Sequence, residues 1–193
     1  MKASIIIPVF NEERYFELLV NQVKESLKSM SSMISDWEIV IIEDCSTDGT
    51  AKIVKQLALN DSKIRPFFQQ VNSGKGAAIS RGFKESTGDI VIIQDADLEY
   101  DPNEYPKIFD LIIKGKADIV YGSRFKGGGS NRVLYFWHTV GNKILTLLSN
   151  MMTNLNLTDM ETCYKAFRGE LIRGMKLESN RFGIEPEMTA KIS

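Results

Sequence analysis

The 193-residue sequence predicts an α/β protein whose central, mostly parallel sheet has helices on both faces. Short apolar runs alternate with amphipathic stretches through the first 120 residues, as they do in proteins with a parallel sheet. The run at residues 90–93 is wholly apolar, which indicates a strand that is buried on both faces. The length suits one domain, residues 1–193, with a sizeable core.

The first sixty residues contain two strands and two helices in alternation. Residues 4–9 form a β-rich run, and residues 13–28 then repeat apolar side chains at helical spacing. Residues 37–42 predict a second buried strand. Residues 50–59 predict a second helix, because their apolar side chains again recur at helical spacing.

The same alternation continues through the next sixty residues. Residues 64–69 predict a weaker third strand, residues 75–85 a third helix, and residues 90–94 a fourth strand. Pro102 marks the start of the next helix, because proline is tolerated in the first helical turn. Residues 117–121 predict a fifth strand.

This fold class also predicts where a ligand binds. In open parallel sheets, ligands bind beyond the carboxyl ends of the strands, at the point where the strand order reverses. The segments that follow the predicted strands are rich in carboxylates, which favours a positively charged partner. These segments are residues 8–12, 43–50, 94–99 and 122–124.

The motif Asp95-Ala96-Asp97 is the sharpest signal for chemistry. Two carboxylates placed two residues apart at a strand end point the same way and can share one cation. Mg²⁺ or Mn²⁺, completed by substrate phosphates, is the natural partner, and Glu99 can add or orient a ligand. The alternative is a polar turn that only ends the strand, which is the commoner meaning of an isolated motif.

Two other segments on this rim suggest ligand contacts. Asp44 can accept a hydrogen bond from a nucleotide base, whereas Asp48 and Gly49 are better explained as a turn and helix cap. Lys75 stands at a predicted helix start and can approach a diphosphate, although a packing loop is equally compatible. The sequence around it lacks the spacing of a P-loop, and no dinucleotide-binding motif follows the first strand.

Charged residues late in the chain form a second group of candidates. Arg124 suits bidentate contact with a phosphate, and the alternative is a surface arginine. An aromatic segment combines two acids with two bases, for which a structural ion-pair network is the alternative: Asp159, Glu161, Lys165 and Arg168.

Residues 132–152 form a helical stretch that is more apolar than a normal core helix requires. Tyr135, Trp137 and Lys143 suit a membrane interface. For most of the apolar side chains, packing on the sheet is the favoured interpretation. Peripheral membrane contact remains the alternative for the apolar side chains that a core helix would not need.

Composition excludes several classes of function. The net charge of −1 and the pI of about 6.0 give no support for nucleic-acid binding. Two cysteines make no disulfide framework, which favours a reduced, cytoplasmic chain, and the single histidine, His138, excludes a multi-histidine metal site. The sequence shows no signal peptide or spanning segment, and its end at residues 188–193 within a helical pattern predicts truncation of a longer protein.

Taken in order, these motifs resemble glycosyltransferase family 2, and within it the branch of dolichyl-phosphate mannose synthases and other polyprenyl-phosphate glycosyltransferases. The match extends over nearly the whole chain. It rests on Pro8 with Asn11 and Glu12, residues 44–50, Gly74-Lys75-Gly76, Asp95-Ala96-Asp97-Leu98, Gly122-Ser123-Arg124 and residues 159–168.

The resemblance implies a GT-A fold, a nucleotide-sugar donor, a divalent metal and an inverting transfer. It implies that Pro8, Phe10 and Glu12 frame the nucleotide, that Asp44 binds the base, and that Asp159 lies toward the acceptor. The predicted catalytic residues are Asp97, Asp159 and Arg124, and the predicted metal ligands are Asp95, Asp97 and Glu99. The predicted substrate-binding residues are Pro8, Phe10, Glu12, Asp44, Lys75, Asp95, Ala96, Glu99, Glu161, Lys165 and Arg168.

We therefore expect a metal-dependent hexosyltransferase of cell-envelope glycosylation that acts at the cytoplasmic face of the membrane. Its donor is GDP-mannose or a UDP-hexose, and its acceptor is a polyprenyl or dolichyl phosphate. One alternative is a family 2 enzyme with a saccharide acceptor, for which Asp159 or Glu161 is the candidate general base. The other is a non-catalytic nucleotide-sugar-binding module.

Overall fold

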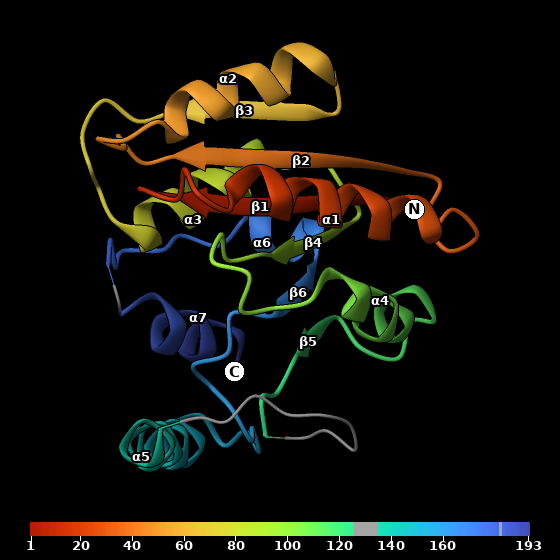
Figure 1. The fold of residues 1–193 in the computed structure, drawn as a ribbon. Coiled ribbons are helices and arrows are strands. Elements are labelled where there is room, and N and C mark those ends of the chain that lie inside the picture. The colour runs from red at the N-terminus through yellow and green to blue at the C-terminus, as the bar shows by residue number, and fades with distance from the viewer. Residues whose placement is uncertain (126–134, 182) are drawn as a thin grey trace.

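The computed structural model describes residues 1–125, 135–181 and 183–193, and these residues contain one six-stranded sheet (Figure 1). The strands lie in the order β3-β2-β1-β4-β6-β5. The first four are mutually parallel, and β6 runs antiparallel to both of its neighbours. The strands are β1 (Lys2–Val9), β2 (Asp36–Glu43), β3 (Ile64–Phe68), β4 (Ile90–Ile93), β5 (Ile119–Tyr121) and β6 (Lys165–Arg168).

Helices cover both faces of this sheet, as predicted. Side chains of α1, α2 and α4 join one apolar core, and those of α3, α6 and α7 join the other. The helices are α1 (Phe16–Ser29), α2 (Thr50–Asn60), α3 (Lys75–Glu85), the short η1 (Pro102–Glu104), α4 (Tyr105–Ile113), α5 (Phe136–Thr153), α6 (Gly169–Arg173) and α7 (Ile184–Ile192).

The central strands are buried on both faces, which confirms the interpretation of their unbroken apolar runs. Ile5 and Ile7 of β1 join the core under α1, whereas Ile6 between them joins the core under α3. All four residues of β4 are buried in the same alternating way. A strand that buries both faces has no polar side to alternate with, so its sequence is continuously apolar.

The fifth predicted strand does not extend the parallel sheet. β5 is shorter than expected and pairs with β6, which lies between it and β4. Val91 and Ile92 of β4 stand opposite Phe167 and Ala166 of β6. This pairing joins segments far apart in the chain, and local apolar patterning carries no information about such a partner.

Helix α5 corrects another prediction, because it is not a core helix. Of its eighteen residues, all of which are described, only Thr146 is buried. It packs against α7 and lies at the far side of that helix from the sheet (Figure 1). Trp137 and Met152 are 76% and 87% exposed. Within the described residues, no helix has the length and apolar character needed to span a bilayer; residues 132–134 of the predicted apolar stretch lie outside the described residues.

Candidate functional site

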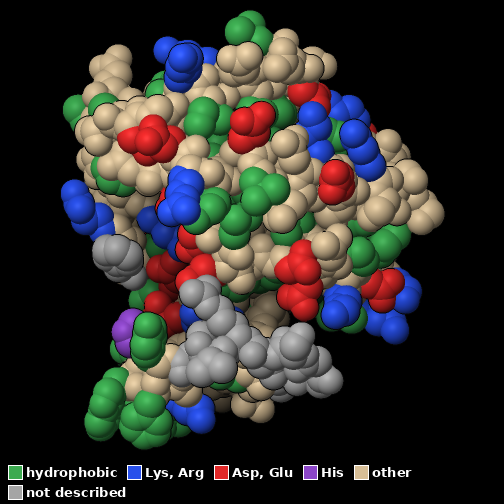
Figure 2. All heavy atoms as spheres, viewed as in Figure 1, with side chains coloured by type: hydrophobic (Ala, Val, Ile, Leu, Met, Phe, Trp, Pro, Cys, Tyr) green, Lys and Arg blue, Asp and Glu red, His purple; other side chains and the backbone are tan. Residues whose placement is uncertain are grey.

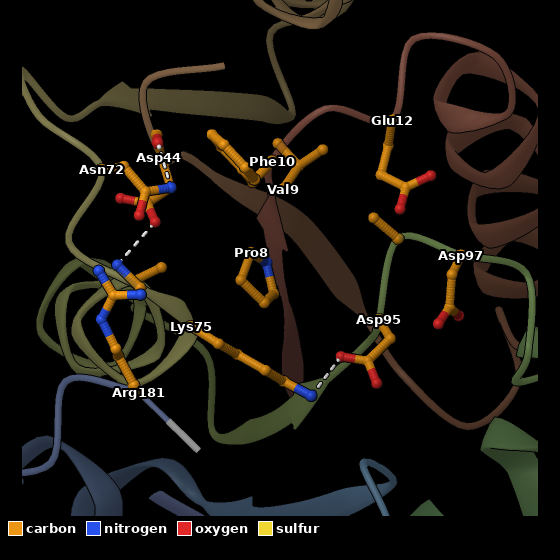
Figure 3. A pocket seen from close by; sticks show the side chains of 13 residues that line it. Pro8, Val9, Phe10, Glu12, Asp44, Asn72, Lys75, Asp95, Asp97 and Arg181 are labelled. Atoms are coloured by element: carbon orange, nitrogen blue, oxygen red, sulfur yellow. Dashed lines mark hydrogen bonds and ion pairs between the residues drawn. The ribbon is translucent and has the colours of Figure 1, made fainter. Parts of the chain in front are cut away.

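A pocket of about 440 Å³ opens at the carboxyl ends of β1, β2 and β4 (Figure 3). The strand order reverses between β1 and β4, so the pocket lies at the position that the fold class predicts. Many of the residues that the sequence nominated line it: Pro8, Phe10, Glu12, Asp44, Lys75, Asp95, Ala96 and Asp97.

The loops after β1 and β2 are locked together, and this fixes one wall of the pocket. The side-chain oxygen of Asn11 accepts a hydrogen bond from the backbone N–H of Thr47 (2.8 Å), and the N–H of Glu12 donates to Thr50 Oγ1 (2.9 Å). Asn11 and Cys45 have φ values of 55° and 61°. Residues other than glycine adopt such left-handed conformations mainly where their surroundings hold them. The lock leaves the Glu12 side chain facing the pocket (Figure 3).

Asp44 joins the end of β2 to the start of α3. Its buried carboxylate accepts hydrogen bonds from Gln69 Nε2 (2.6 Å) and from the backbone N–H groups of Ser73 and Gly74 (both 2.8 Å). A carboxylate has about four acceptor positions, so three protein bonds leave capacity for one more donor. Asp44 can therefore both shape the loop and accept a hydrogen bond from a ligand in the pocket.

Three carboxylates gather on one side of the pocket: Glu12, Asp95 and Asp97 (Figure 3). Partial burial of its carboxyl raises the pKa of Asp97, although the residue as a whole is exposed, and repulsion from Asp95 and Glu99 adds to the effect. Burial also raises the pKa of Glu12, with a further contribution from Asp97. Both pKa shifts arise first from burial and then from repulsion between neighbouring carboxylates, and a bound cation would relieve that repulsion.

These oxygen donors suit a hard divalent cation, but the described residues contain no ready-made group of three His, Cys, Asp or Glu that could hold one. Asp95 is paired with Lys75, and Glu99 is absent from the pocket lining. The backbone N–H of Glu99 donates to Asp97 Oδ1 (3.0 Å). The set therefore fits an ion that is shared with a ligand, as Mg²⁺ commonly is with substrate phosphates.

Lys75 places a permanent positive charge beside these acids. Its Nζ lies 2.8 Å from Asp95 Oδ1 and 3.5 Å from Glu185 Oε1. Burial alone would lower the pKa of Lys75, but the surrounding negative groups outweigh it and raise the pKa overall. Lys75 is thus protonated at neutral pH and can face an anionic ligand in the pocket.

Arg124 and Asp159 bind each other instead of lining the pocket. Arg124 Nε and Nη2 donate to the two carboxylate oxygens of Asp159 at 2.8 and 2.9 Å, and Asn142 Nδ2 donates at 2.8 Å. Burial by itself would raise the pKa of Asp159, but the hydrogen bonds from Arg124 and Asn142 outweigh it and lower the pKa. Asp159 thus takes part in an ion pair, the alternative that the sequence left open for its segment, and Arg124 is its half-buried partner.

The other acids and bases of this segment lie in different environments. Burial raises the pKa of the half-buried Glu161, and Glu185 adds to the effect. Lys165 is fully buried, donates to the carbonyl oxygen of Thr162, and has its pKa lowered to about 8 by burial. Arg168 stands opposite Ile90, at the end of the sheet away from the pocket, and pairs with Asp118.

Sequence reasoning missed two residues that matter here. Arg181, in the segment before α7, is exposed and lines the pocket beside Gly74. No motif marked it, because a lone arginine far along the chain gives no sign of where the fold returns it. Gln94 at the end of β4 is fully buried beneath the Asp95–Asp97 loop, and only its polarity after an apolar run could have signalled it.

Comparison with known proteins gives a consistent family match. The family model described as glycosyl transferase family 2 matches residues 4–175. A dolichol-phosphate mannosyltransferase from Pyrococcus furiosus is 29% identical over 193 residues, which are 99% of this chain and 53% of that protein. An undecaprenyl-phosphate mannosyltransferase from Micrococcus luteus is 27% identical over 198 residues, covering 98% of this chain and 76% of that protein.

A third relative is the undecaprenyl-phosphate 4-deoxy-4-formamido-L-arabinose transferase of Proteus mirabilis, 29% identical over 90% of this chain and 51% of that protein. The chain thus spans about half the length of several curated relatives that it matches.

Solved structures confirm the predicted GT-A fold. Glucosyl-3-phosphoglycerate synthase from Mycobacterium tuberculosis, crystallised with Mn²⁺, UDP-glucose and phosphoglyceric acid, matches with a TM-score of 0.68 and 21% identity. The match covers 96% of this chain and 62% of that one. TarS residues 1–349 from S. aureus match with a TM-score of 0.59 and 23% identity, over 90% of this chain and 48% of that one.

Proposed function

The chain belongs to glycosyl transferase family 2, and we propose that it transfers a hexose, with inversion, from a nucleotide sugar to a polyprenyl phosphate. The observation that carries the proposal is the pocket at the switch point, where carboxylates and Lys75 surround a space open to a ligand. The mannosyltransferases named above, whose names specify dolichol phosphate and undecaprenyl phosphate, support a lipid-phosphate acceptor.

The donor would lie along the pocket from Asp44 to Asp97. Pro8, Phe10 and Glu12 would frame the nucleotide, and Asp44 would accept from a donor N–H on the base with its remaining acceptor position. GDP-mannose and a UDP-hexose both carry such a group. The basic side chains that line the pocket, Lys75 and Arg181, would face the diphosphate.

Mg²⁺ or Mn²⁺ fits the acidic side of the pocket. Asp97 and Asp95 would hold the ion, and it would supply positive charge to the nucleoside diphosphate as that group leaves. The proximity of these carboxylates supports the assignment, because the repulsion between them, which adds to the effect of burial on the pKa values of Asp97 and Glu12, would be relieved by a cation.

The acceptor chemistry agrees with the environment of Asp159. A lipid phosphate has a second pKa of about 6, so it is mostly dianionic at neutral pH and needs little help from a base. Asp159, with its low pKa and its hydrogen bonds to Arg124 and Asn142, is poorly suited to take a proton. Lys165 and Arg168 would not contact this phosphate, since one is buried and the other faces away from the pocket.

A saccharide acceptor is the second candidate, and one observation favours it. A sugar hydroxyl requires a general base, and the half-buried Glu161 has a raised pKa of the kind that such a role needs. Product formed on a soluble glycan, and unaffected by lipid phosphate, would select this function.

Helix α5 supports peripheral contact with the cytoplasmic face of a membrane. Its exposed apolar side chains belong to the group of hydrophobic side chains at the lower left of the molecule in Figure 2. In this proposal, residues 135–152 rest on the lipid surface and keep a lipid-linked acceptor near the protein. We expect vesicle flotation, and we expect the double variant Trp137→Ser, Met151→Ser to lose it.

The flotation control is Leu59→Ser, which removes an apolar side chain that is 87% exposed on α2, away from α5. Equal flotation of the double variant and this control would contradict the membrane contact.

The transfer assay combines the protein, Mg²⁺ or Mn²⁺, labelled GDP-mannose or UDP-hexose, and a short polyprenyl phosphate. We expect a labelled, chloroform-soluble product that disappears with a chelator. No lipid-linked product with any donor would overturn the proposal. Metal-dependent nucleotide binding in calorimetry without turnover would instead identify a non-catalytic binding module.

A further inference from the structure

Gln94 is a fully buried amide at the end of β4 whose hydrogen-bonding groups are all used. Its Oε1 accepts hydrogen bonds from the hydroxyls of Tyr105 (2.6 Å) and Tyr164 (2.9 Å). Its Nε2 donates to the carbonyl oxygens of Asp95 (3.1 Å) and Tyr100 (3.3 Å). An amide side chain has two donor hydrogens and two acceptor lone pairs, so this set is complete.

The two carbonyl groups bound by Gln94 stand at the two ends of the loop that carries Asp95 and Asp97. Between them, Leu98 has a φ of 60°, in the left-handed region. A residue other than glycine adopts that conformation when its surroundings hold it there. Gln94 is the buried side chain that spans the loop, so it is placed to hold this shape.

The tyrosines connect this amide to two other parts of the fold. Tyr105 is the first residue of α4, and Tyr164 directly precedes β6. The ring of Tyr100 packs 4.7 Å from that of Tyr164, and the Tyr100 hydroxyl accepts a hydrogen bond from the backbone N–H of Cys163 (3.0 Å). The loop is thus tied both to α4 and to the segment that precedes β6.

We infer that Gln94 is a positioning residue for the metal-dependent part of donor binding. It holds the Asp95–Asp97 loop in the one shape that presents both carboxylates to the pocket. The inference rests on the proposed function, because it assigns a ligand to those carboxylates. It goes beyond that function by placing the control of their geometry on a buried amide and two tyrosine hydroxyls.

The test compares three variants with a matched control. Gln94→Met keeps the length of the side chain and removes all four hydrogen bonds, while Tyr105→Phe and Tyr164→Phe each remove one. Ile92→Val is the control: it removes a methylene group two residues before Gln94, at a position of β4 that is equally buried, and its side chain makes no hydrogen bond to the loop. Calorimetry then measures UDP and GDP affinity with and without Mn²⁺, and hydrogen exchange follows the amides of residues 96–100.

We expect Gln94→Met to lower the Mn²⁺-dependent gain in nucleotide affinity about 10- to 100-fold, the usual range when a group that supports metal ligands is removed. Each tyrosine variant should lower it several-fold, with faster exchange at residues 96–100. Metal-free nucleotide affinity should stay unchanged, which a general loss of structure would not allow.

The inference is overturned if the metal-dependent gain and the loop exchange of the variants equal those of Ile92→Val. If Gln94→Met fails to fold, the two tyrosine variants decide the question. Absence of Mn²⁺-dependent binding in the unmodified protein would refute the proposed function instead. Loop exchange, which needs no ligand, would then decide whether Gln94 holds the loop.

Discussion

Glu38 of β2 should make the stability of this protein strongly dependent on acid. The carboxylate is buried near the amino end of β2, at the end of the sheet opposite the pocket, and it accepts hydrogen bonds from Ser4 Oγ (2.6 Å) and the Thr87 N–H (2.7 Å). Lys2 Nζ and Arg65 Nη1 each lie 3.0 Å from its other oxygen. Burial alone would raise the pKa of Glu38, but these partners outweigh it and lower the pKa from 4.5 to about 2.

The size of the effect follows from that pKa. A carboxyl group whose pKa falls from 4.5 to about 2 on folding stabilises the folded state by about 3 kcal/mol when ionised. Because the folded pKa is the lower one, this contribution is fully present above pH 4.5. It is lost as the pH falls from 4.5 toward 2. Glu38→Gln should therefore cost about 3 kcal/mol at pH 7 and very little near pH 2.

Urea unfolding, followed by circular dichroism at several values between pH 7 and pH 3, measures this difference. Glu25→Gln is the control, since it makes the same charge change at an exposed position of α1. The difference in free energy of unfolding between the two variants should be about 3 kcal/mol at pH 7 and should decrease below pH 4.5. A difference that stays constant with pH, or no difference at pH 7, would refute the reasoning.

Three further predictions concern the pocket. Asp97→Asn should abolish metal-dependent nucleotide binding in calorimetry, and unchanged affinity would remove Asp97 from the metal assignment. Lys75→Met leaves Asp95 and the buried Glu185 without their cation, so it should lower the free energy of unfolding by about 3 kcal/mol at pH 7. An unaltered urea midpoint would show that the ion pairs of Lys75 with Asp95 and Glu185 do not stabilise the fold. Arg181→Gln should weaken nucleoside diphosphate binding about tenfold, more at low salt than at high salt. If the substitution weakens binding equally at both ionic strengths, or not at all, Arg181 does not contact the phosphates.

The parts of the fold that depend on local pattern could be predicted from the sequence. Helix α3 begins and ends where its periodicity does, at Lys75 and Glu85, and β1 and β4 are buried as their apolar runs indicate. The place of β6 between β4 and β5 could not be predicted, because pairing between distant segments leaves no local trace. The prediction that α5 packs on the sheet was wrong, because an apolar helix face has the same sequence pattern whether protein, lipid or another partner covers it.

Some residues of the candidate site could likewise be predicted from the sequence, and others could not. Asp95 and Asp97 were predictable, since two carboxylates directly after a buried strand must emerge at the ligand-binding edge. The mutual pairing of Arg124 and Asp159 was not, because both residue types also suit substrate contacts and only the fold brings them within 2.8 Å. Arg181 reaches the pocket through a late return of the chain that no motif announces.

The position of β6 has a consequence for how the protein is made. Until the ribosome has released Lys165–Arg168, β4 is an open edge composed only of Ile and Val. Unpaired apolar edges promote association between incomplete chains. Synthesis therefore passes through an interval in which the four-stranded sheet β3-β2-β1-β4 can associate with other incomplete chains through β4. That interval ends when β6 pairs with β4, which also brings Tyr164 to Gln94 below the loop that carries Asp95 and Asp97.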